Sequence, residues 1–166
     1  MIRERTHSWA DPAELKTIIR SLPGLECLQR LARQELPPPP MANTMGIRLV
    51  EVSRGRAVFV STPAEFHYNP IGVAHGGYAM TLLDSAMGCA VHSTLEAGDI
   101  YTTIEFKINF LRPLTVLTGE VRGVGTVLNS SRTTALAEGR LEGPDGKLHG
   151  FATCTCLIRR AGDATS

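Results

Sequence analysis

The chain has 166 residues, the length of a single ordinary domain, since most domains hold about 100 to 200 residues. Hydrophobic residues make up 43% of the sequence and charged residues 20%, which excludes a disordered or collagen-like chain. The 17 Lys and Arg residues nearly balance the 16 Asp and Glu residues, so the net charge is +1. This balance, together with an aromatic content of only 5%, argues against a nucleic-acid-binding protein.

The cysteines give no sign of a disulfide framework or a metal site. No C-x-x-C pair occurs among them and no cluster of histidines accompanies them, so we expect free thiols and no bound metal. The first residues lack the apolar segment of a secretion signal, which favours a protein of the reducing cytoplasm. The cysteines in question are Cys27, Cys89, Cys154 and Cys156.

The N-terminal part of the chain is predicted to be helical over residues 11–35. Asp11 suits the N-cap and Pro12 the first helical position, while Pro23-Gly24 divides the stretch into two short helices. Four prolines at 37–40 then form a stiff, extended spacer. The predicted division is a helical arm with a Pro-rich linker over residues 1–40, a main domain over 41–160 and a C-terminal tail over 161–166.

The main domain alternates between strand-like segments and one apolar helix. Short turns between consecutive strands imply an antiparallel sheet and therefore an α+β fold. The predicted order is strands at 46–53 and 56–62, a helix at 76–91, and strands at 101–111, 114–128, 132–142 and 147–158.

The apolar helix is too short for a membrane span, which needs about 20 residues, and it carries Asp84 near its middle. We therefore predict a buried helix and no association with a membrane. A helix that is apolar on all sides must be covered on all sides. We expect a strongly curved sheet to wrap around it and a second subunit to close the remaining face.

Two glycines, Gly76 and Gly77, open this helix. They leave its first N–H groups approachable at the positive end of the helix dipole, where an anion or a developing oxyanion can bind. Alternatively, they let the helix pack close to the sheet. Asp84 lies further along among apolar neighbours, where burying a carboxylate costs on the order of several kcal/mol unless it is hydrogen-bonded or changes its pKa. We favour a catalytic role for Asp84 over a structural one.

The spacing of these residues constrains how they could cooperate. Gly76 and Asp84 are eight residues apart, about 12 Å along a helix. One helix therefore cannot bring its own N-terminal donors and its own acid to the same carbonyl group. If both act together, the acid comes from a second copy of the chain, and two antiparallel copies form two equivalent sites. We expect an obligate homodimer, which two such dimers could extend to a homotetramer.

Residues 69–84, NPIGVAHGGYAMTLLD, and residues 103–113, TIEFKINFLRP, carry a family resemblance. Over about residues 43–158 the sequence resembles the hot-dog-fold acyl-CoA thioesterases of the phenylacetate-degradation (PaaI-like) type. This resemblance implies a hot-dog fold, in which a curved antiparallel sheet wraps around one long central helix. It also implies hydrolysis of a small aromatic, short-chain or medium-chain acyl-CoA. No cofactor is implied, because coenzyme A is part of the substrate.

The resemblance also implies catalytic roles for individual residues. Asp84 would act as nucleophile or as general base on water, and the Gly76 N–H would polarise the thioester carbonyl. Asn69 would hold the carbonyl or the water. His75 would orient its loop or bind the acyl group, unless it is simply a histidine bonded to backbone at the start of the helix. Thr103 matches a hydroxyl residue that positions the attacking water.

The role of Thr103 conflicts with simple strand alternation. Alternation places Ile104, Phe106, Ile108 and Phe110 on the apolar face, and so puts Thr103 on the opposite face with Glu105 and Lys107. That face would meet a second subunit rather than the enclosed helix. A threonine that merely favours a strand is the alternative.

Substrate binding is predicted to involve Gly77, Tyr78, Arg112 and Arg132, with the arginines pairing with phosphate oxygens of coenzyme A. Arg159 and Arg160 are further candidates for the phosphates. The acyl pocket would be lined by Tyr78, Met80, Leu83 or Met87, although such residues more often belong to a core. Two other functions stay open at this point. One is a non-catalytic module on the same fold that binds acyl-CoA or an aromatic ligand, and the other is a hot-dog dehydratase or hydratase.

Overall fold

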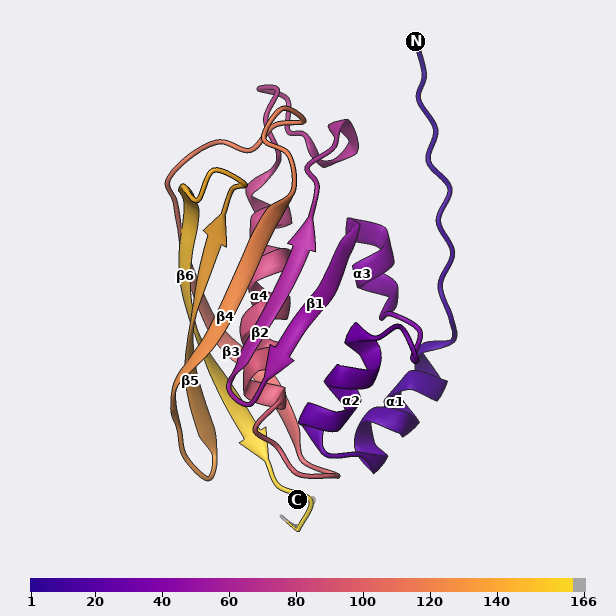
Figure 1. Cartoon of the computed structure of the whole chain (residues 1–166), viewed down its shortest axis with the longest axis vertical. Coiled ribbons are helices and arrows are strands. Elements are labelled where there is room, and N and C mark those ends of the chain that lie inside the picture. The colour runs from indigo at the N-terminus through magenta and orange to yellow at the C-terminus, as the bar shows by residue number, and fades with distance from the viewer. Residues whose placement is uncertain (163–166) are drawn as a thin grey trace.

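A computed structural model describes residues 1–162, so most of the predicted C-terminal tail, residues 163–166, lies outside the described residues. The strands form one antiparallel sheet in the order β1-β2-β4-β5-β6-β3 (Figure 1). Their bounds are β1 Ile47–Ser53, β2 Arg56–Ser61, β3 Ile100–Phe110, β4 Val121–Ser130, β5 Thr134–Glu142 and β6 Leu148–Arg159.

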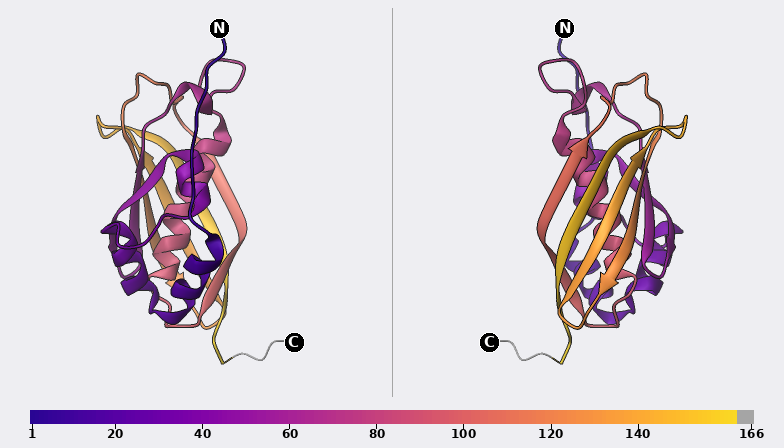
Figure 2. Two further views of the ribbon diagram at one scale, coloured as in Figure 1. Left: turned by 90° about the vertical axis from the view of Figure 1, so that its right-hand side faces the viewer. Right: turned by 90° about the vertical axis from the view of Figure 1, so that its left-hand side faces the viewer.

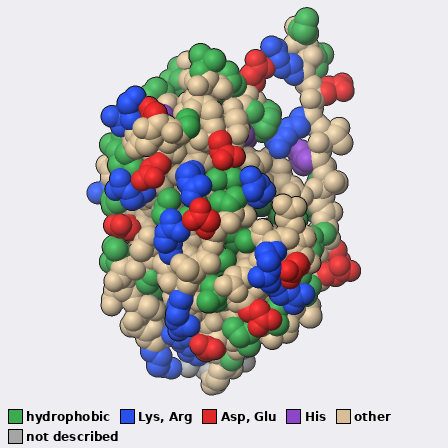
Figure 3. All heavy atoms as spheres, viewed as in Figure 1, with side chains coloured by type: hydrophobic (Ala, Val, Ile, Leu, Met, Phe, Trp, Pro, Cys, Tyr) green, Lys and Arg blue, Asp and Glu red, His purple; other side chains and the backbone are tan. Residues whose placement is uncertain are grey.

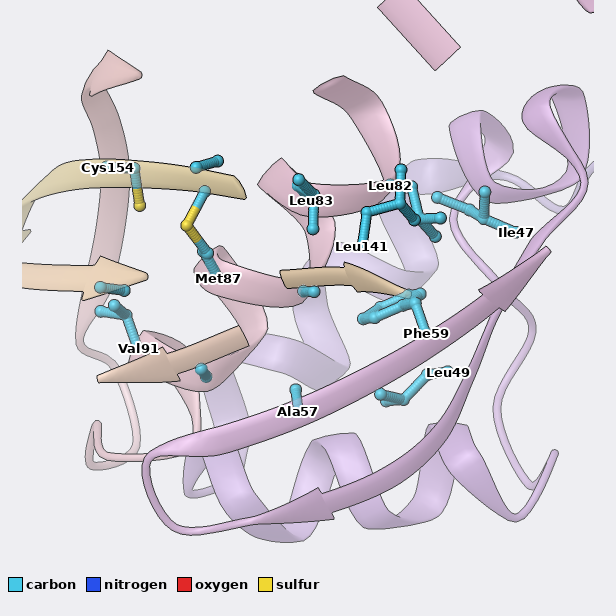
Figure 4. Packing of buried hydrophobic residues seen from close by; sticks show 14 of the residues in the cluster. Ile47, Leu49, Ala57, Phe59, Leu82, Leu83, Met87, Val91, Leu141 and Cys154 are labelled. Atoms are coloured by element: carbon cyan, nitrogen blue, oxygen red, sulfur yellow. The ribbon is translucent and has the colours of Figure 1, made fainter. Parts of the chain in front are cut away.

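One long helix, α4 (Gly76–His92), lies in the concave side of this sheet (Figures 1 and 2). Figure 4 shows Leu82, Leu83 and Met87 of α4 gathered with Phe59 of β2 in the core between helix and sheet. Close approach of helix to sheet requires glycine, because a Cβ atom at Gly125 would lie 2.3 Å from the backbone of α4. The predicted α+β, hot-dog architecture is confirmed.

The N-terminal arm folds as two helices, α1 (Pro12–Ser21) and α2 (Gly24–Ala32), separated where Pro23-Gly24 predicts a break. The Asp11 carboxylate caps α1 by accepting from the Ala13 N–H at 2.9 Å. The arm is tied to the main domain, since the Gly24 N–H donates to the Leu95 carbonyl at 3.0 Å and α2 packs beside β1. A third helix, α3 (Pro40–Met45), is absent from the sequence prediction, which treats Pro40 as part of the extended spacer. Proline fits there because it occupies the first turn, where no N–H bond is needed.

The largest difference from the predicted strands lies at the start of β4. Residues 114–120 form a loop, and β4 begins only at Val121. The loop closes on itself, because the Thr118 N–H donates to the Thr115 carbonyl and the Thr115 N–H donates to the Thr118 hydroxyl, both at 2.9 Å. Leu114 is buried and anchors the loop. These local threonine bonds replace the strand ladder that the apolar content of the segment suggests.

The cysteines carry free thiols, as predicted. Cys154 and Cys156 lie on the buried, helix-facing side of β6 with their sulfur atoms 4.0 Å apart. No helix within residues 1–162 is long and apolar enough to cross a membrane. The same residues contain no group of three or more His, Cys, Asp or Glu side chains arranged to hold a metal ion.

His92, the last residue of α4, makes the stability of the fold depend on pH. Its side chain is buried, and burial lowers its pKa from the usual 6.5. The unfolded chain therefore binds a proton at this residue more readily than the folded chain does, and stability is lost as pH falls below about 6.5. His67 contributes with the same sign, because burial also lowers its pKa.

We predict that replacing His92 with phenylalanine weakens this dependence. Between pH 7.5 and pH 5.5 the free energy of unfolding should fall by about 1 kcal/mol less in His92→Phe than in the unmodified protein. Urea denaturation at both pH values measures the difference. His7→Gln, at an exposed histidine, is the control and should keep the full dependence. Equal slopes in His92→Phe and the unmodified protein would contradict the account of His92.

Candidate active site

The loop that precedes α4 is fixed by backbone hydrogen bonds. Tyr68 and Ala74 pair across it as an antiparallel bridge, and the Asn69 N–H donates to the Val73 carbonyl at 2.9 Å. The Ala74 N–H donates to the Leu114 carbonyl at 2.8 Å, which ties the loop to the segment that leads into β4. These bonds hold the start of α4 in one place relative to the sheet.

His75 is the N-cap of α4. Its Nδ1 atom accepts from the Gly77 N–H at 2.9 Å, the backbone-bonded arrangement described by the alternative prediction for this histidine. The Gly76 N–H, in contrast, has no hydrogen-bond acceptor within residues 1–162. Of the two glycine N–H groups considered in the sequence, only that of Gly76 is therefore available to a ligand, at the positive end of a 17-residue helix.

Gly76 lines a cleft of about 380 Å³, which we call the Gly76 cleft. Asn69 lies in its wall, but the Asn69 side-chain oxygen already accepts from the Ile71 N–H at 3.1 Å and so shapes the loop. Arg112 also borders the cleft and donates to the Leu148 carbonyl at 2.5 Å. The cleft is lined by Asn69, Val73, Ala74, His75, Gly76, Ala79, Phe110, Leu111, Arg112, Pro113, Leu114, Leu141 and His149.

Asp84 lies in a second cleft of about 300 Å³, the Asp84 cleft, lined by Met80, Thr81, Asp84, Thr103 and Phe106. The Thr103 hydroxyl donates to Asp84 Oδ1 at 3.0 Å. In this chain the Asp84 side chain is exposed, so the prediction of a carboxylate enclosed by apolar side chains is wrong for a single subunit. The reason is helical geometry, because the buried neighbours Leu82 and Leu83 point away from the face that carries Asp84.

The position of Thr103 corrects the prediction from strand alternation. A bulge at Ile104 shifts the register between β3 and β6, so that Thr103 pairs with Cys156 and Phe106 with Cys154. One extra residue reverses the faces on either side of it. Thr103 therefore lies on the helix-facing side with Phe106, whereas Ile104 points outward and is 58% exposed. No glycine or proline marks this bulge in the sequence, so alternation alone could not reveal it.

The two clefts share none of their lining residues. Asn69, His75, Gly76 and Arg112 meet in the Gly76 cleft, and Asp84 and Thr103 meet in the Asp84 cleft. Both clefts are built on the same helix, at positions eight residues apart, or about 12 Å. Within one chain, the predicted donor (the Gly76 N–H) and the predicted acid (Asp84) therefore lie in separate clefts.

The apolar residues predicted to line the acyl pocket are mostly core residues. Leu83 and Met87 are fully buried, and only Met80 borders the Asp84 cleft. Tyr78 is also buried, with its ring stacked on His67 at a centroid distance of 4.2 Å. Burial raises the pKa of Tyr78 to about 12, although the nearby Ser61 hydroxyl opposes the shift.

The remaining arginine candidates lie far from the Gly76 cleft. Arg132 is exposed in the β4–β5 turn and Arg159 ends β6, at the end of the sheet opposite to the start of α4 (Figure 1). Arg160 donates to the Arg132 carbonyl and pairs with Asp99 at 2.8 Å. Arg112 is thus the candidate arginine that borders the Gly76 cleft.

The surface carries charges of both signs. On the face shown in Figure 3, Lys and Arg side chains are interspersed with Asp and Glu side chains over the sheet and the arm. Glu51 of β1 pairs with Arg122 at 2.5 Å and with Arg56 at 3.2 Å, and these two arginines hold the pKa of Glu51 below its usual value. Such interspersed charges create no strong field of one sign on this face.

Comparison with known proteins relates the sequence and fold of this chain to those of thioesterases. The sequence profile of the Thioesterase superfamily matches residues 71–149. A protein of Saccharolobus solfataricus whose name describes it as an esterase is 33% identical to this chain over 116 residues. These residues are 70% of this chain and 81% of that protein. The 1,4-dihydroxy-2-naphthoyl-CoA hydrolase of Listeria monocytogenes is 24% identical over 120 residues, which are 72% of this chain and 96% of that enzyme.

A solved structure has a similar fold. It is that of a thioesterase from Ralstonia eutropha JMP134, described as a phenylacetic acid degradation-related protein. This protein is 31% identical to the present chain and superposes with a TM-score of 0.71. The match covers 78% of this chain and 98% of that one. Nearly all of the Ralstonia protein therefore has a counterpart in the present chain, whereas part of the present chain has no counterpart in that protein.

Proposed function

This chain belongs to the thioesterase superfamily, and we propose that it hydrolyses an acyl-CoA thioester to the free acid and coenzyme A. One observation carries the proposal. A carboxylate held by a threonine hydroxyl lies in the lining of one cleft, and the helix start with the bare Gly76 N–H lies in the lining of another. Acyl transfer needs these two elements, a base or nucleophile and a donor for the developing oxyanion.

A second copy of the chain would bring the two elements together. β3 is an edge strand with Ile104 and Phe110 exposed by 58% and 55%, and such an edge favours pairing with another strand. Beside it, the face of α4 that carries Met80 and Asp84 is left open by the sheet (Figure 2). We propose a two-fold homodimer in which this face meets its counterpart and Asp84 approaches the partner's Gly76.

The reaction follows from this arrangement. The thioester carbonyl oxygen would accept a hydrogen bond from the Gly76 N–H of one subunit. Asp84 of the other subunit would then either attack the carbonyl carbon or take a proton from a water molecule that attacks it. If Asp84 attacks, the C–S bond breaks, coenzyme A leaves as the thiolate, and water then cleaves the acyl–Asp84 anhydride to give the free acid and restore Asp84. If water attacks, the C–S bond breaks with the same leaving group and the free acid forms directly. In both routes the coenzyme A thiolate takes up the proton that the water molecule gives up.

Other residues would position these groups. The Thr103 hydroxyl fixes one oxygen of Asp84 and leaves the second oxygen free to react. His75 and Asn69 shape the start of α4 and its loop, since their side chains already bond to backbone N–H groups. Arg112, at the border of the Gly76 cleft, is the proposed contact for a phosphate of coenzyme A.

Coenzyme A enters this reaction as part of the substrate, and the proposed chemistry uses no further cofactor. The four free thiols suit the reducing cytoplasm, where we propose that the protein acts.

Release of thiol from a panel of acyl-CoA esters tests the proposed function. The panel should include acetyl-, hexanoyl- and benzoyl-CoA, and at least one should be turned over with kcat/KM above about 10⁴ M⁻¹s⁻¹. Binding of these esters without release of thiol would contradict the proposal and favour a ligand-binding module. The hydratase alternative needs a separate assay with an α,β-unsaturated acyl-CoA. Addition of water to its double bond without release of thiol would favour a hydratase.

Removing the Thr103 hydroxyl should slow the reaction without abolishing it. Thr103→Val keeps the shape of the side chain but loses the 3.0 Å bond to Asp84, and a hydrogen bond to a charged group is worth about 1.5–3 kcal/mol. We expect kcat to fall about 10- to 100-fold, as measured by thiol release at saturating substrate. Thr103→Ser, which keeps the hydroxyl, should retain most of the activity. A fully active Thr103→Val would show that the hydroxyl does not position Asp84.

A further inference from the structure

Behind the hydrogen bond between Thr103 and Asp84 lies a buried thiol that the proposed reaction does not use. Cys156 of β6 pairs directly with Thr103 of β3, and directly opposite residues on neighbouring strands point to the same face of a sheet. The Cys156 side chain is fully buried on the helix-facing side. Its sulfur lies 3.9 Å from the Thr103 hydroxyl oxygen, within reach of a hydrogen bond that involves sulfur. The thiol therefore contacts the group that holds the candidate catalytic carboxylate.

The direction of these hydrogen bonds follows from the number of protons available. An ionised carboxylate only accepts hydrogen bonds, so the single Thr103 hydroxyl proton is used in the 3.0 Å bond to Asp84 Oδ1. In the contact between Thr103 and Cys156, the Cys156 S–H is therefore the donor and the Thr103 oxygen is the acceptor. The hydrogen bonds thus run in one direction, from Cys156 to Thr103 to Asp84.

A second thiol completes the surroundings of Cys156. The Cys154 sulfur lies 4.0 Å away on the same face of β6, and its own S–H serves this contact because the Cys156 proton is used on Thr103. Hydrogen bonds to Cys154 and Thr103 lower the pKa of the Cys156 thiol, while burial and the Asp84 charge oppose the shift. A thiolate at Cys156 would be fully buried and one hydroxyl group away from a carboxylate, so Cys156 keeps its proton and remains a donor.

We propose that Cys156 is a positioning residue for the reacting carboxylate, a role that rests on the proposed function. A hydroxyl group that accepts a hydrogen bond becomes a better donor, so the Cys156 S–H strengthens the bond from Thr103 to Asp84. It also restrains rotation of the Thr103 hydroxyl, because the oxygen is bonded to β6 while its proton is bonded to α4. Oδ1 of Asp84 is thereby held in place, and Oδ2 remains as the reacting oxygen.

Removing the thiol should slow turnover modestly. We expect Cys156→Ala to lower kcat about three- to fivefold and to leave KM within about twofold, because an S–H···O bond is weak and is not made to the substrate. Cys154→Ala is the matched control, since it removes an equally buried thiol from the same face of β6 without touching Thr103. It should lower kcat less than about twofold. Equal losses in the two variants would assign the effect to packing and overturn the proposal.

A double-mutant cycle separates positioning from packing. If Cys156 acts through the Thr103 hydroxyl, Cys156→Ala should change kcat by less than about 1.5-fold in the Thr103→Val background, where no hydroxyl remains to accept the hydrogen bond. A loss in that background as large as in the unmodified protein would show that Cys156 acts by another route, and would also overturn the proposal.

The S–H stretching band in the Raman spectrum provides a readout that needs no activity. The Cys156 band is identified by its disappearance in Cys156→Ala. It should move to higher wavenumber in Thr103→Val, because the S–H loses its acceptor. A Cys156 band that is missing from the unmodified protein, or that does not move in Thr103→Val, would contradict the proposed hydrogen bond. A protein that hydrolyses no acyl-CoA would refute the proposed function, whereas the Raman measurement would still decide whether Cys156 holds Thr103.

Discussion

Asp84→Asn is expected to lower kcat for acyl-CoA hydrolysis by about 10³- to 10⁴-fold. Asparagine has the same shape as aspartate and keeps an oxygen that can accept from the Thr103 hydroxyl, so the cleft should persist. It can neither attack the thioester carbon nor take a proton from water. Thiol release at saturating substrate measures the loss.

The control for this variant is another carboxylate of the same region. Glu105 lies on β3 two residues after Thr103, but its exposed side chain faces away from α4 beyond the bulge. Glu105→Gln should keep activity close to that of the unmodified protein. Asp84→Asn should still bind acyl-CoA and elute from a sizing column at the unmodified position. Activity of Asp84→Asn above about a tenth of the original would contradict a catalytic carboxylate at this position.

Removing the free N–H at the start of α4 should have the second-largest effect. Gly76→Pro deletes this donor, and loss of one oxyanion donor typically costs about 10²- to 10³-fold in kcat. The backbone accepts the change, because Gly76 is the first helical residue and His75 before it is extended, with ψ at 142°. The predicted result is a folded protein with kcat reduced about 10²- to 10³-fold in the thiol-release assay.

Gly76→Ala is the matched control for this proline. In both variants a Cβ atom meets the Phe110 ring, with the Cζ atom 2.8 Å away, but only proline removes the N–H. Phe110 is 55% exposed and can turn outward, and Phe110→Leu can be added to both variants to relieve the contact. We expect the alanine variant to be much more active than the proline variant. Equal losses would attribute the effect to crowding and exclude the proposed role of the N–H group.

Much of the fold could be predicted because its signals are local. Pro23-Gly24 divides the arm into two helices, and Asp11 caps α1. The apolar run of α4 predicts a buried helix clearly, because its side chains pack against both the sheet and the arm. The separation between Gly76 and Asp84 follows from helical rise alone, and the structure places the two in different clefts.

The features that escaped prediction depend on tertiary contacts. The bulge at Ile104, which turns Thr103 toward Asp84, is a property of the pairing between β3 and β6 rather than of either strand. The exposure of Asp84 depends on which face of α4 the sheet leaves open. An apolar cavity of about 180 Å³ lies where residues of α1 and α2 meet the end of α4, and no single segment of the sequence predicts it.

The shared active site is the central claim, and subunit mixing tests it most directly. Asp84→Asn and Gly76→Pro chains with different affinity tags can be produced together, and the mixed dimer can be purified through both tags. When each site takes its acid from one subunit and its N–H from the other, one site of the mixed dimer carries both defects and the other carries none. The mixed dimer should then recover about half of the activity of the unmodified dimer. A mixed dimer as inactive as its two parent variants would show that each site lies within a single chain.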